Sequence, residues 1–301
     1  MASLCESSPM VITVHNASVH TGCSLLTSSR PVQSAGHVRG THVPRILHQM
    51  YRERQLPPLH RAYQHTWSRL HPDWTIVLWT DDELRQLVRW HYPWFEPTLE
   101  KARHWVSVAD ACRSLLLHRF GGAYMDLDVE AFQPLDDVIP PGANALLSEP
   151  ADPAHMLSRA GHPLWMWTVR HYSHSIGAPG VFDAAGPGAL EKSLKEYEAF
   201  VSAQRHGGAR AEWSVSRFSL FLFAPRPFWN ASMNGGISIV DDRATSVVPC
   251  HRTLGGCSSF WHRAKHLEWL RPMWGYHHCT GGWWRGVNAL ARLAPSETDG
   301  R

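Results

Sequence analysis

The 301-residue chain lacks several features that would decide its class at once. It contains no apolar run near the ~20 residues that a membrane-spanning helix needs. It also contains no run of five like charges, which is the usual mark of a nucleic-acid-binding tail, and its formal net charge is only +3. These absences predict a protein with no membrane span and no nucleic-acid partner.

Cysteine pairs and signal-peptide features are equally sparse. None of the six cysteines forms a pair at zinc-finger spacing. Cys250 and Cys257 flank a short loop that a disulfide could close, although the nearby histidines leave a structural zinc site as the alternative. No Lys or Arg precedes Arg30, and no apolar block of about 7 to 15 residues stands there, so a secretory signal peptide is not expected.

The composition itself is that of a globular protein. Hydrophobic residues make up 44% of the chain and charged residues 18%, which is enough apolar surface for a buried core. Residues 1–42 show no sustained periodicity, and we expect them to form a loose N-terminal extension. Residues 43–285 are predicted to form one folded domain, followed by a C-terminal tail over 286–301.

Strand and helix patterns alternate at the start of the predicted domain. An apolar run over 43–48 predicts a strand, and residues 59–70 carry apolar side chains at helical spacing. Residues 74–79 predict a second strand. Thr80 and Glu83 then form the pattern of a capping box, which begins another helix. Strands that alternate with helices predict an α/β fold with a mainly parallel central sheet.

The most informative stretch runs from Arg103 to Glu130. Its first part has helical periodicity and ends at Gly121-Gly122, because glycine adopts a positive φ at no steric cost. The next residues alternate, which predicts a strand with one buried apolar face and with Tyr124, Asp126 and Asp128 on the other. Such a strand holds the two carboxylates about 7 Å apart near its carboxyl end, where open α/β sheets bind ligands.

Two carboxylates in this arrangement suit a hard divalent cation. Mg²⁺ and Mn²⁺ commonly bind one or two carboxylates together with substrate phosphates. Asp110 and Arg113 lie three residues apart on the preceding helix, so they share a face and can grip sugar hydroxyls or a phosphate. The alternatives are a solvated strand end beside a surface salt bridge, and a glycoside hydrolase, whose two carboxyls must flank a sugar. Convergence of both acids on one point favours the metal.

Several short motifs stand in a distinctive order along the chain. They are Val43–Gln49, His71–Trp74, Leu78–Asp81, Tyr92–Phe95, Ala109–Asp128 with its Asp-X-Asp pair, Gly186–Gly188 and His277–Trp283. Together they resemble the sugar transferases of glycosyltransferase family 32, which include inositol-phosphoceramide mannosyltransferases and the initiating α-1,6-mannosyltransferases of yeast glycans. The resemblance spans roughly residues 43–284.

The resemblance implies a fold, a metal and a set of site residues. The fold is the nucleotide-diphospho-sugar transferase type (GT-A), and the enzymes are metal-dependent and retain the anomeric configuration. The expected metal is Mn²⁺ or Mg²⁺, held by Asp128, Asp126 and His278. The expected catalytic residues are Asp126, Asp128 and Arg113. The expected donor-binding residues are Asp110, Arg113, Tyr124, Asp126 and Trp283, and His48 joins them because it stands at the carboxyl end of the first predicted strand.

The expected reaction moves a hexose from a nucleotide sugar to a glycan, glycolipid or protein acceptor. Mannose from GDP-mannose is preferred because the resemblance leans toward mannosyltransferases, with galactose or N-acetylglucosamine from UDP close behind. Membrane association would come through a lipid acceptor.

The sequence departs from the family pattern in two respects. Gly282 stands where a small hydroxyl residue usually precedes the final Trp, which leaves a catalytically degenerate protein that binds donor or glycan as an alternative. The usual N-terminal membrane anchor is not visible. The resemblance therefore suggests the Golgi or another secretory compartment, whereas the missing signal leaves the cytoplasm open.

Overall fold

The computed structural model describes residue 5 and residues 11–14, 17–27, 36–204, 213–219, 237–240, 247–250 and 275–277. Its strands are β1 (Val11–Val14), β2 (Ala17–Thr21), β3 (Ile46–Met50), β4 (Thr75–Trp79), β5 (Gly122–Met125), β6 (Val129–Ala131), β7 (Ala145–Glu149), β8 (His155–Ser158), β9 (Ser216–Ser219), β10 (Ile237–Val240), β11 (Val247–Cys250) and β12 (Gly275–His277).

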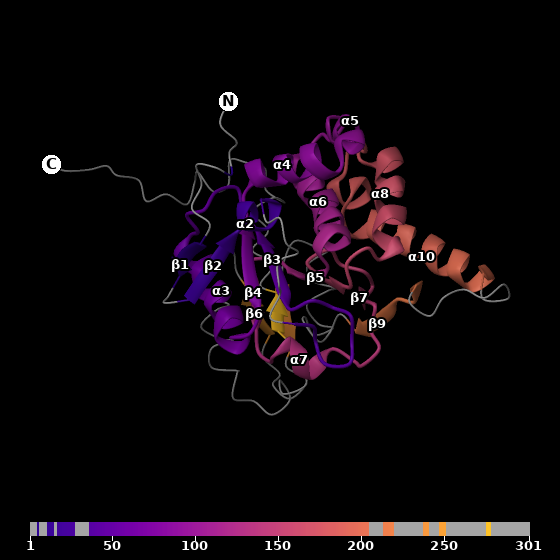
Figure 1. Ribbon diagram of the computed structural model, residues 1–301. Coiled ribbons are helices and arrows are strands. Elements are labelled where there is room, and N and C mark those ends of the chain that lie inside the picture. Colours follow the sequence, from indigo (N-terminus) through magenta and orange to yellow (C-terminus); the bar gives the residue numbers. More distant parts are fainter. Residues whose placement is uncertain are drawn as a thin grey trace.

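The helices pack on both sides of a central sheet (Figure 1). They are α2 (Gly22–Leu26), α3 (Pro58–Leu70), α4 (Asp81–His91), the 3₁₀ turn η1 (Pro93–Phe95), α5 (Glu96–Leu99), α6 (Trp105–Phe120), α7 (Leu135–Val138), α8 (Pro163–Ser175), α9 (Val181–Ala184) and α10 (Pro187–Gln204). None of the helices in the described part of the chain is long and apolar enough to cross a bilayer.

The central sheet has eight strands in the order β1-β2-β4-β3-β5-β8-β7-β9. The run β2-β4-β3-β5 is parallel throughout, and β7 is parallel to β9. The pairs β1–β2, β5–β8 and β8–β7 are antiparallel. The predicted α/β fold is therefore confirmed, with its parallel part in the predicted strand–helix units.

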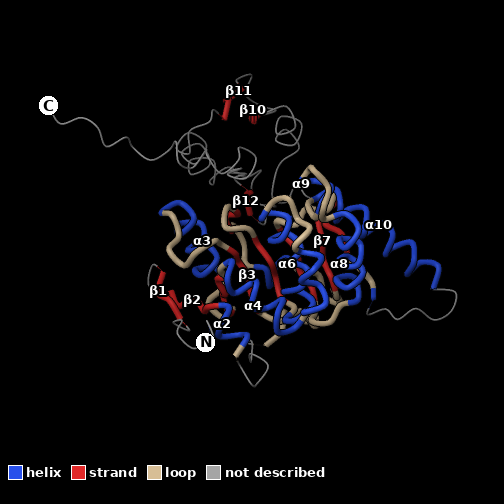
Figure 2. The backbone as a smooth tube through the Cα atoms, turned by 90° about the horizontal axis from the view of Figure 1, so that it is seen from above, coloured by secondary structure: helices blue, strands red, loops and turns tan. Residues whose placement is uncertain are grey.

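Two smaller sheets complete the topology. β10 pairs with β11, and β12 pairs with β6, both in antiparallel fashion. In the second of these sheets the backbone of His277 lies opposite Val129. Figure 2, which views the molecule from above, shows β12 close to α3.

Successive residues of the central strands pack into different cores. In β4, Ile76 and Leu78 belong to the cluster that contains Trp67 of α3, whereas Val77 and Trp79 belong to the cluster formed with α4 and α6. This follows from the two-residue period of a strand. Because helices cover both faces, the strand reads as a continuous apolar run rather than an alternating one.

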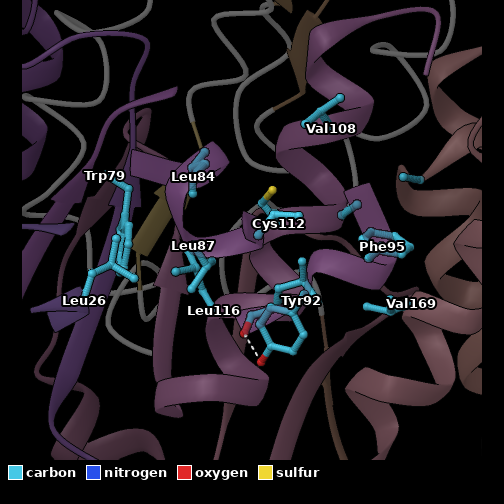
Figure 3. Packing of buried hydrophobic residues seen from close by; sticks show 14 of the residues in the cluster. Leu26, Trp79, Leu84, Leu87, Tyr92, Phe95, Val108, Cys112, Leu116 and Val169 are labelled. Atoms are coloured by element: carbon cyan, nitrogen blue, oxygen red, sulfur yellow. Dashed lines mark hydrogen bonds between the residues drawn. The ribbon is translucent and has the colours of Figure 1, made fainter. Parts of the chain in front are cut away.

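Figure 3 shows the cluster between the sheet, α4 and α6. Cys112 lies in it together with Leu87 and Leu116, and burial raises the pKa of the Cys112 thiol to about 12. The thiol therefore stays protonated and packs as a small apolar group. Tyr92 places its hydroxyl at the edge of the same cluster and donates to the carbonyl oxygen of Leu115 at 3.3 Å.

The predicted helix boundaries at both sides of this cluster are confirmed. The Thr80 hydroxyl accepts from the backbone N–H of Glu83 at 3.3 Å, and the Glu83 carboxylate accepts from the backbone N–H of Thr80 at 2.9 Å. This is the predicted capping box. Helix α6 ends at Gly121, whose φ of 65° is followed by a φ of 92° at Gly122.

The N-terminal region differs from the predicted loose extension. β2 pairs in parallel with β4, and Cys23 in α2 forms a disulfide with Cys5. The backbone N–H of Cys23 also donates to the Glu83 carboxylate at 2.7 Å. The expectation is therefore wrong for residues 17–27, because pairing with β4 and the bond to Glu83 hold a segment whose own sequence shows no sustained period. The choice between a disulfide and a zinc site for Cys250 and Cys257 involves a residue outside the described ranges.

Gly122 should be among the positions least tolerant of substitution. Its φ is positive, and an added Cβ would collide with the carbonyl oxygen of Ile46 on the neighbouring strand. We expect Gly122→Ala to lower the free energy of unfolding by more than about 2 kcal/mol. Gly142→Ala is the matched control, because Gly142 has a φ of 80° but an added Cβ there would meet no atom within 4 Å. Equal losses of stability in urea unfolding would contradict the steric explanation.

Candidate active site

Asp126 and Asp128 lie on a turn that joins β5 to β6. The backbone N–H of Val129 donates to the Asp126 carbonyl at 3.0 Å, and the backbone N–H of Asp126 donates to the Ala154 carbonyl at 2.9 Å. Leu127 between them is buried and belongs to the core beneath α3. Both acids are half-buried. The structure therefore corrects the predicted strand, which ends at Met125 because Leu127 anchors a turn instead.

Arg113 connects this turn to helix α6. One nitrogen of its guanidinium lies 3.1 Å from a carboxylate oxygen of Asp110, and the other lies 3.0 Å from a carboxylate oxygen of Asp126. The predicted pairing with Asp110 is confirmed, and the bond to Asp126 is an additional finding. A planar guanidinium suits this bridging position because its donors are held in a fixed fork.

Tyr124 completes the contacts around Arg113. Its hydroxyl donates to the Asp126 carboxylate at 2.6 Å, and the Arg113 guanidinium carbon lies 4.7 Å from the centre of its ring. Burial raises the pKa of Tyr124 well above its usual value, so the phenol remains a donor at neutral pH. The four side chains Asp110, Arg113, Tyr124 and Asp126 thus form one hydrogen-bonded cluster.

Burial and charge act in opposite directions within this cluster. Burial raises the pKa of Asp110 to about 7, although the Arg113 charge partly offsets this increase. Burial disfavours the charged form of Arg113, but Asp126, Tyr124 and Asp110 outweigh it and hold the pKa of Arg113 above its usual value. Arg113 therefore remains charged, while Asp110 can exchange a proton near neutral pH.

Helix α3 holds the far end of the turn. The Trp67 indole N–H donates to the carbonyl oxygen of Val129 at 2.7 Å, and the Thr66 hydroxyl accepts from the backbone N–H of Ala131 at 2.9 Å. The turn is therefore tied to α6 on one side of the sheet and to α3 on the other. The Asp126 carboxylate and the backbone that follows Asp128 are thus held by side chains from elements far apart in the sequence.

His48 does not contribute to this site. It is fully buried, its Nε2 donates to the Gly121 carbonyl at 2.9 Å, and its Nδ1 accepts from the Trp79 indole at 3.1 Å. Burial lowers the pKa of His48 to about 4, so the ring is neutral. The structure corrects the predicted donor-binding role, because both ring nitrogens are used inside the core.

Two further predicted residues, His278 and Trp283, lie outside the described residues, as does Gly282. The side chain of His277 is likewise not described. Their predicted roles remain predictions. What is described is the backbone pairing of β12 with β6, directly after Asp128 in the chain.

Sequence reasoning missed two neighbours of the acidic cluster. The charge of Asp152 acts on the pKa of both Asp110 and Arg113, so it is a nearby third carboxylate. The charges of Asp128 and Asp126 act on the pKa of His60 in α3 in the same way. Neither residue belongs to a recognisable motif, and only the fold brings them to the turn.

The acidic pair fits a divalent cation that takes some of its ligands from a substrate. Asp126 and Asp128 supply the carboxylate oxygens that Mg²⁺ and Mn²⁺ prefer. Within the described ranges, no group of three or more His, Cys, Asp or Glu side chains is arranged to hold a metal. The described residues therefore suit a metal that also binds substrate phosphates rather than a closed structural site.

A separate cavity of about 660 Å³ lies away from this cluster. Its lining includes His37, Asn144 and Arg159. Asn144 precedes β7 and Arg159 follows the antiparallel β8, so the cavity is at the amino edge of the sheet. It shares no residue with the acidic pair.

Comparison with known proteins places this geometry in a class. Residues 57–145 match the family described as the glycosyltransferase sugar-binding region containing a DXD motif. This range includes the whole cluster of Asp110, Arg113, Tyr124 and Asp126, together with Asp128. The segment that builds the site is therefore similar to the glycosyltransferase sugar-binding region containing a DXD motif, as the resemblance implied.

Two curated relatives are similar to part of this chain. The chain is 25% identical over 217 residues to mannosyl phosphorylinositol ceramide synthase CSH1 of Saccharomyces cerevisiae, covering 68% of this chain and 58% of the relative. It is 30% identical over 169 residues to inositol phosphoceramide mannosyltransferase 1 of Schizosaccharomyces pombe, covering 52% of each. The chain thus spans between about half and three fifths of these curated relatives. The predicted resemblance to inositol-phosphoceramide mannosyltransferases is confirmed.

A solved structure described as PaToxG Glycosyltransferase is also similar. The superposition has a TM-score of 0.42 at 12% sequence identity, and it covers 56% of this chain and 76% of that chain.

The raised pKa of Asp110 predicts a specific pH dependence of stability. The folded-state value of about 7 lies above the ~3.9 of an unfolded aspartate, so the native protein binds an extra proton between them. This contribution is complete below pH ~4 and is lost as the pH rises through about 7. We expect urea unfolding to show that the free energy of unfolding of Asp110→Asn, relative to that of the wild type, rises by at least about 1 kcal/mol between pH ~5 and ~8.

Asp73→Asn provides the control for this measurement. Asp73 is exposed and precedes β4 at the opposite edge of the sheet, so its substitution should leave the pH dependence unchanged. Identical pH profiles for the wild type and Asp110→Asn would show that Asp110 has no raised pKa.

Proposed function

We propose that the protein is a metal-dependent glycosyltransferase that moves a hexose from a nucleotide sugar with retention of anomeric configuration. The observation that carries this proposal is the bridge that Arg113 forms between Asp110 and the Asp126–Asp128 turn, within the region that matches the sugar-binding family. The bridge fixes a charged fork and two carboxylates around one point. That arrangement suits a substrate that carries both sugar hydroxyls and a diphosphate.

Each described residue has a distinct role in this proposal. Asp128 and Asp126 would hold the Mn²⁺ or Mg²⁺ ion, which when bound neutralises the charge of the diphosphate leaving group. Arg113 keeps Asp126 oriented and adds a permanent positive charge. Asp110, held by Arg113, accepts hydrogen bonds from hydroxyls of the donor sugar. The donor-binding role of Trp283 and the metal-binding role of His278 belong to the proposal on the strength of the resemblance.

Retention is proposed on the strength of the resemblance, and the proposed scheme assigns no protein nucleophile. The carboxylates of Asp110 and Asp126 both face the Arg113 guanidinium, and Tyr124 also binds Asp126, instead of the two acids flanking a sugar from two sides. In this scheme the acceptor hydroxyl attacks the anomeric carbon on the face that the diphosphate leaves, and the departing diphosphate oxygen takes up the hydroxyl proton. Convergence also disfavours the glycoside-hydrolase alternative, whose carboxyls act from opposite sides of the bond.

The donor and acceptor are proposed from the relatives. Their names specify mannosyl transfer and inositol phosphoceramide, so GDP-mannose and a lipid-linked inositol phosphate are the first substrates to test. UDP-galactose and UDP-N-acetylglucosamine come next. Glycan and protein acceptors remain part of the panel.

The reaction should depend on both donor and metal. We expect purified protein to release nucleoside diphosphate from GDP-mannose when an inositol-phosphate lipid and Mn²⁺ are present. A chelator should abolish turnover, and added Mn²⁺ should restore it. A protein that binds donor without turnover would be the degenerate alternative, and hydrolysis of an aryl glycoside without metal would identify a glycosidase. If no donor and acceptor in the panel gives turnover, and calorimetry detects no donor binding, the proposal is refuted.

Substitutions in the cluster should separate chemistry from folding. We expect Asp128→Asn and Asp126→Asn each to lower kcat/KM by about a hundredfold or more, because the charge at the metal position is removed. Arg113→Lys should lower it by about tenfold or more, because lysine keeps the charge but cannot bridge two carboxylates. Thermal unfolding should show the Asp128 variant folded. Asp73→Asn is the matched control, and wild-type rates in Asp128→Asn would contradict the metal assignment.

A further inference from the structure

His60 has an unusual environment in the first turn of α3. Its ring is half-buried, and its Nδ1 atom is buried without a hydrogen-bond partner. Tyr51, which follows β3 directly, contacts the ring edge-on with centroids 5.5 Å apart. A buried polar atom without a partner is destabilising, so its presence calls for an explanation.

His60 and Trp67, which binds the turn, lie along the same face of α3. Trp67 bonds the carbonyl of Val129, and His60 lies two helical turns before Trp67 on the same face. Tyr63 lies between them, and the charges of Glu130 and Asp128 act on its pKa. Burial lowers the pKa of His60, while the charges of Asp128 and Asp126 raise it. The ring is therefore on the side of α3 that faces the acidic pair.

The polar character of this face extends beyond one atom. Gln64, one turn after His60, donates to Gln49 of β3 at 3.0 Å, which leaves Nε2 of Gln49 and Oε1 of Gln64 without partners. Exchanging the oxygen and nitrogen of both amides still leaves one donor and one acceptor unpaired. Hydrophobic packing alone would not require polar groups here.

The position of His60 distinguishes it from a sugar contact. Asp110 and Arg113 come from α6, which covers one face of the sheet, whereas α3 covers the other. The proposed sugar contacts are thus on the α6 side of the turn. The α3 side, with Tyr51 at the end of β3, is left for the nucleotide part of the donor.

We propose that His60 is a further donor-binding residue, whose Nδ1–H donates a hydrogen bond to an oxygen of the nucleoside diphosphate held at Asp126 and Asp128. This inference rests on the proposed function. A hydrogen bond to an anionic oxygen is stronger than one between neutral groups, and it supplies the partner that Nδ1 lacks. The absence of a three-ligand cluster in the described ranges argues for this contact over direct metal ligation.

Calorimetric titration of GDP and UDP in the presence of Mn²⁺ tests the proposal. His60→Phe keeps a ring against Tyr51 but removes the nitrogen, and we expect it to weaken binding about tenfold. His60→Asn places an amide donor near the Nδ1 position and should bind within about threefold of the wild type. His60→Gln places its amide near the Nε2 position instead and should resemble His60→Phe. His174→Ala, an exposed histidine on α8, should bind as the wild type does.

The outcomes separate this inference from the proposed function. If the wild type binds neither GDP nor UDP, the role of His60 and the proposed function are both refuted. If the wild type binds but His60→Phe binds equally tightly, only the role of His60 is overturned. Tighter binding by His60→Gln than by His60→Asn would also overturn it, and this comparison holds even if the Phe variant fails to fold. A reduced affinity of His60→Phe for Mn²⁺ alone would identify a metal contact and refute the proposed hydrogen bond.

Discussion

The buried charge of Arg113 is the constraint on which the candidate site depends. Its side chain is only 10% exposed, so the guanidinium has lost most of its hydration and needs carboxylate partners. Asp110 supplies one from its own helix, and Asp126 supplies the other from the turn after β5. Because an unpaired charge in this position would be strongly destabilising, α6 and the turn are held in one relative position before any substrate binds.

The rest of the fold makes this arrangement rigid. Gly122 lets β5 approach β3 closely at the point where α6 has just ended, so the helix and strand that carry Arg113 and Asp126 start from a fixed corner. On the opposite face, one hydrogen bond from the Trp67 indole and one to the Thr66 hydroxyl fix the backbone that follows Asp128. The turn is thus held from both layers of helices, and the scaffold rather than a ligand orients the Asp126 carboxylate.

Local patterns predicted the local parts of this site and failed where tertiary contacts decide. The capping box, the end of α6 and the Asp110–Arg113 pair depend on residues a few positions apart, and all three are confirmed. Alternation across residues 123–129 predicted one strand, but the strand ends at Met125 and a backbone hydrogen bond from Val129 to Asp126 closes a turn. His48 was misassigned because a strand-end histidine looks the same in sequence whether it faces a ligand or Trp79. The resemblance supplied the family that no single pattern could.

The pairing of β12 with β6 has a consequence for how the molecule folds. Residues 129 and 277 are opposite one another, so this small sheet closes a loop that encloses β7, β8 and α8 through α10. Contacts between such distant residues carry a large loop-closure entropy and form after local ones. The strand next to the acidic turn is therefore added late, and a chain still emerging during synthesis has the turn without this neighbour. Completion of the site is coupled to completion of the domain.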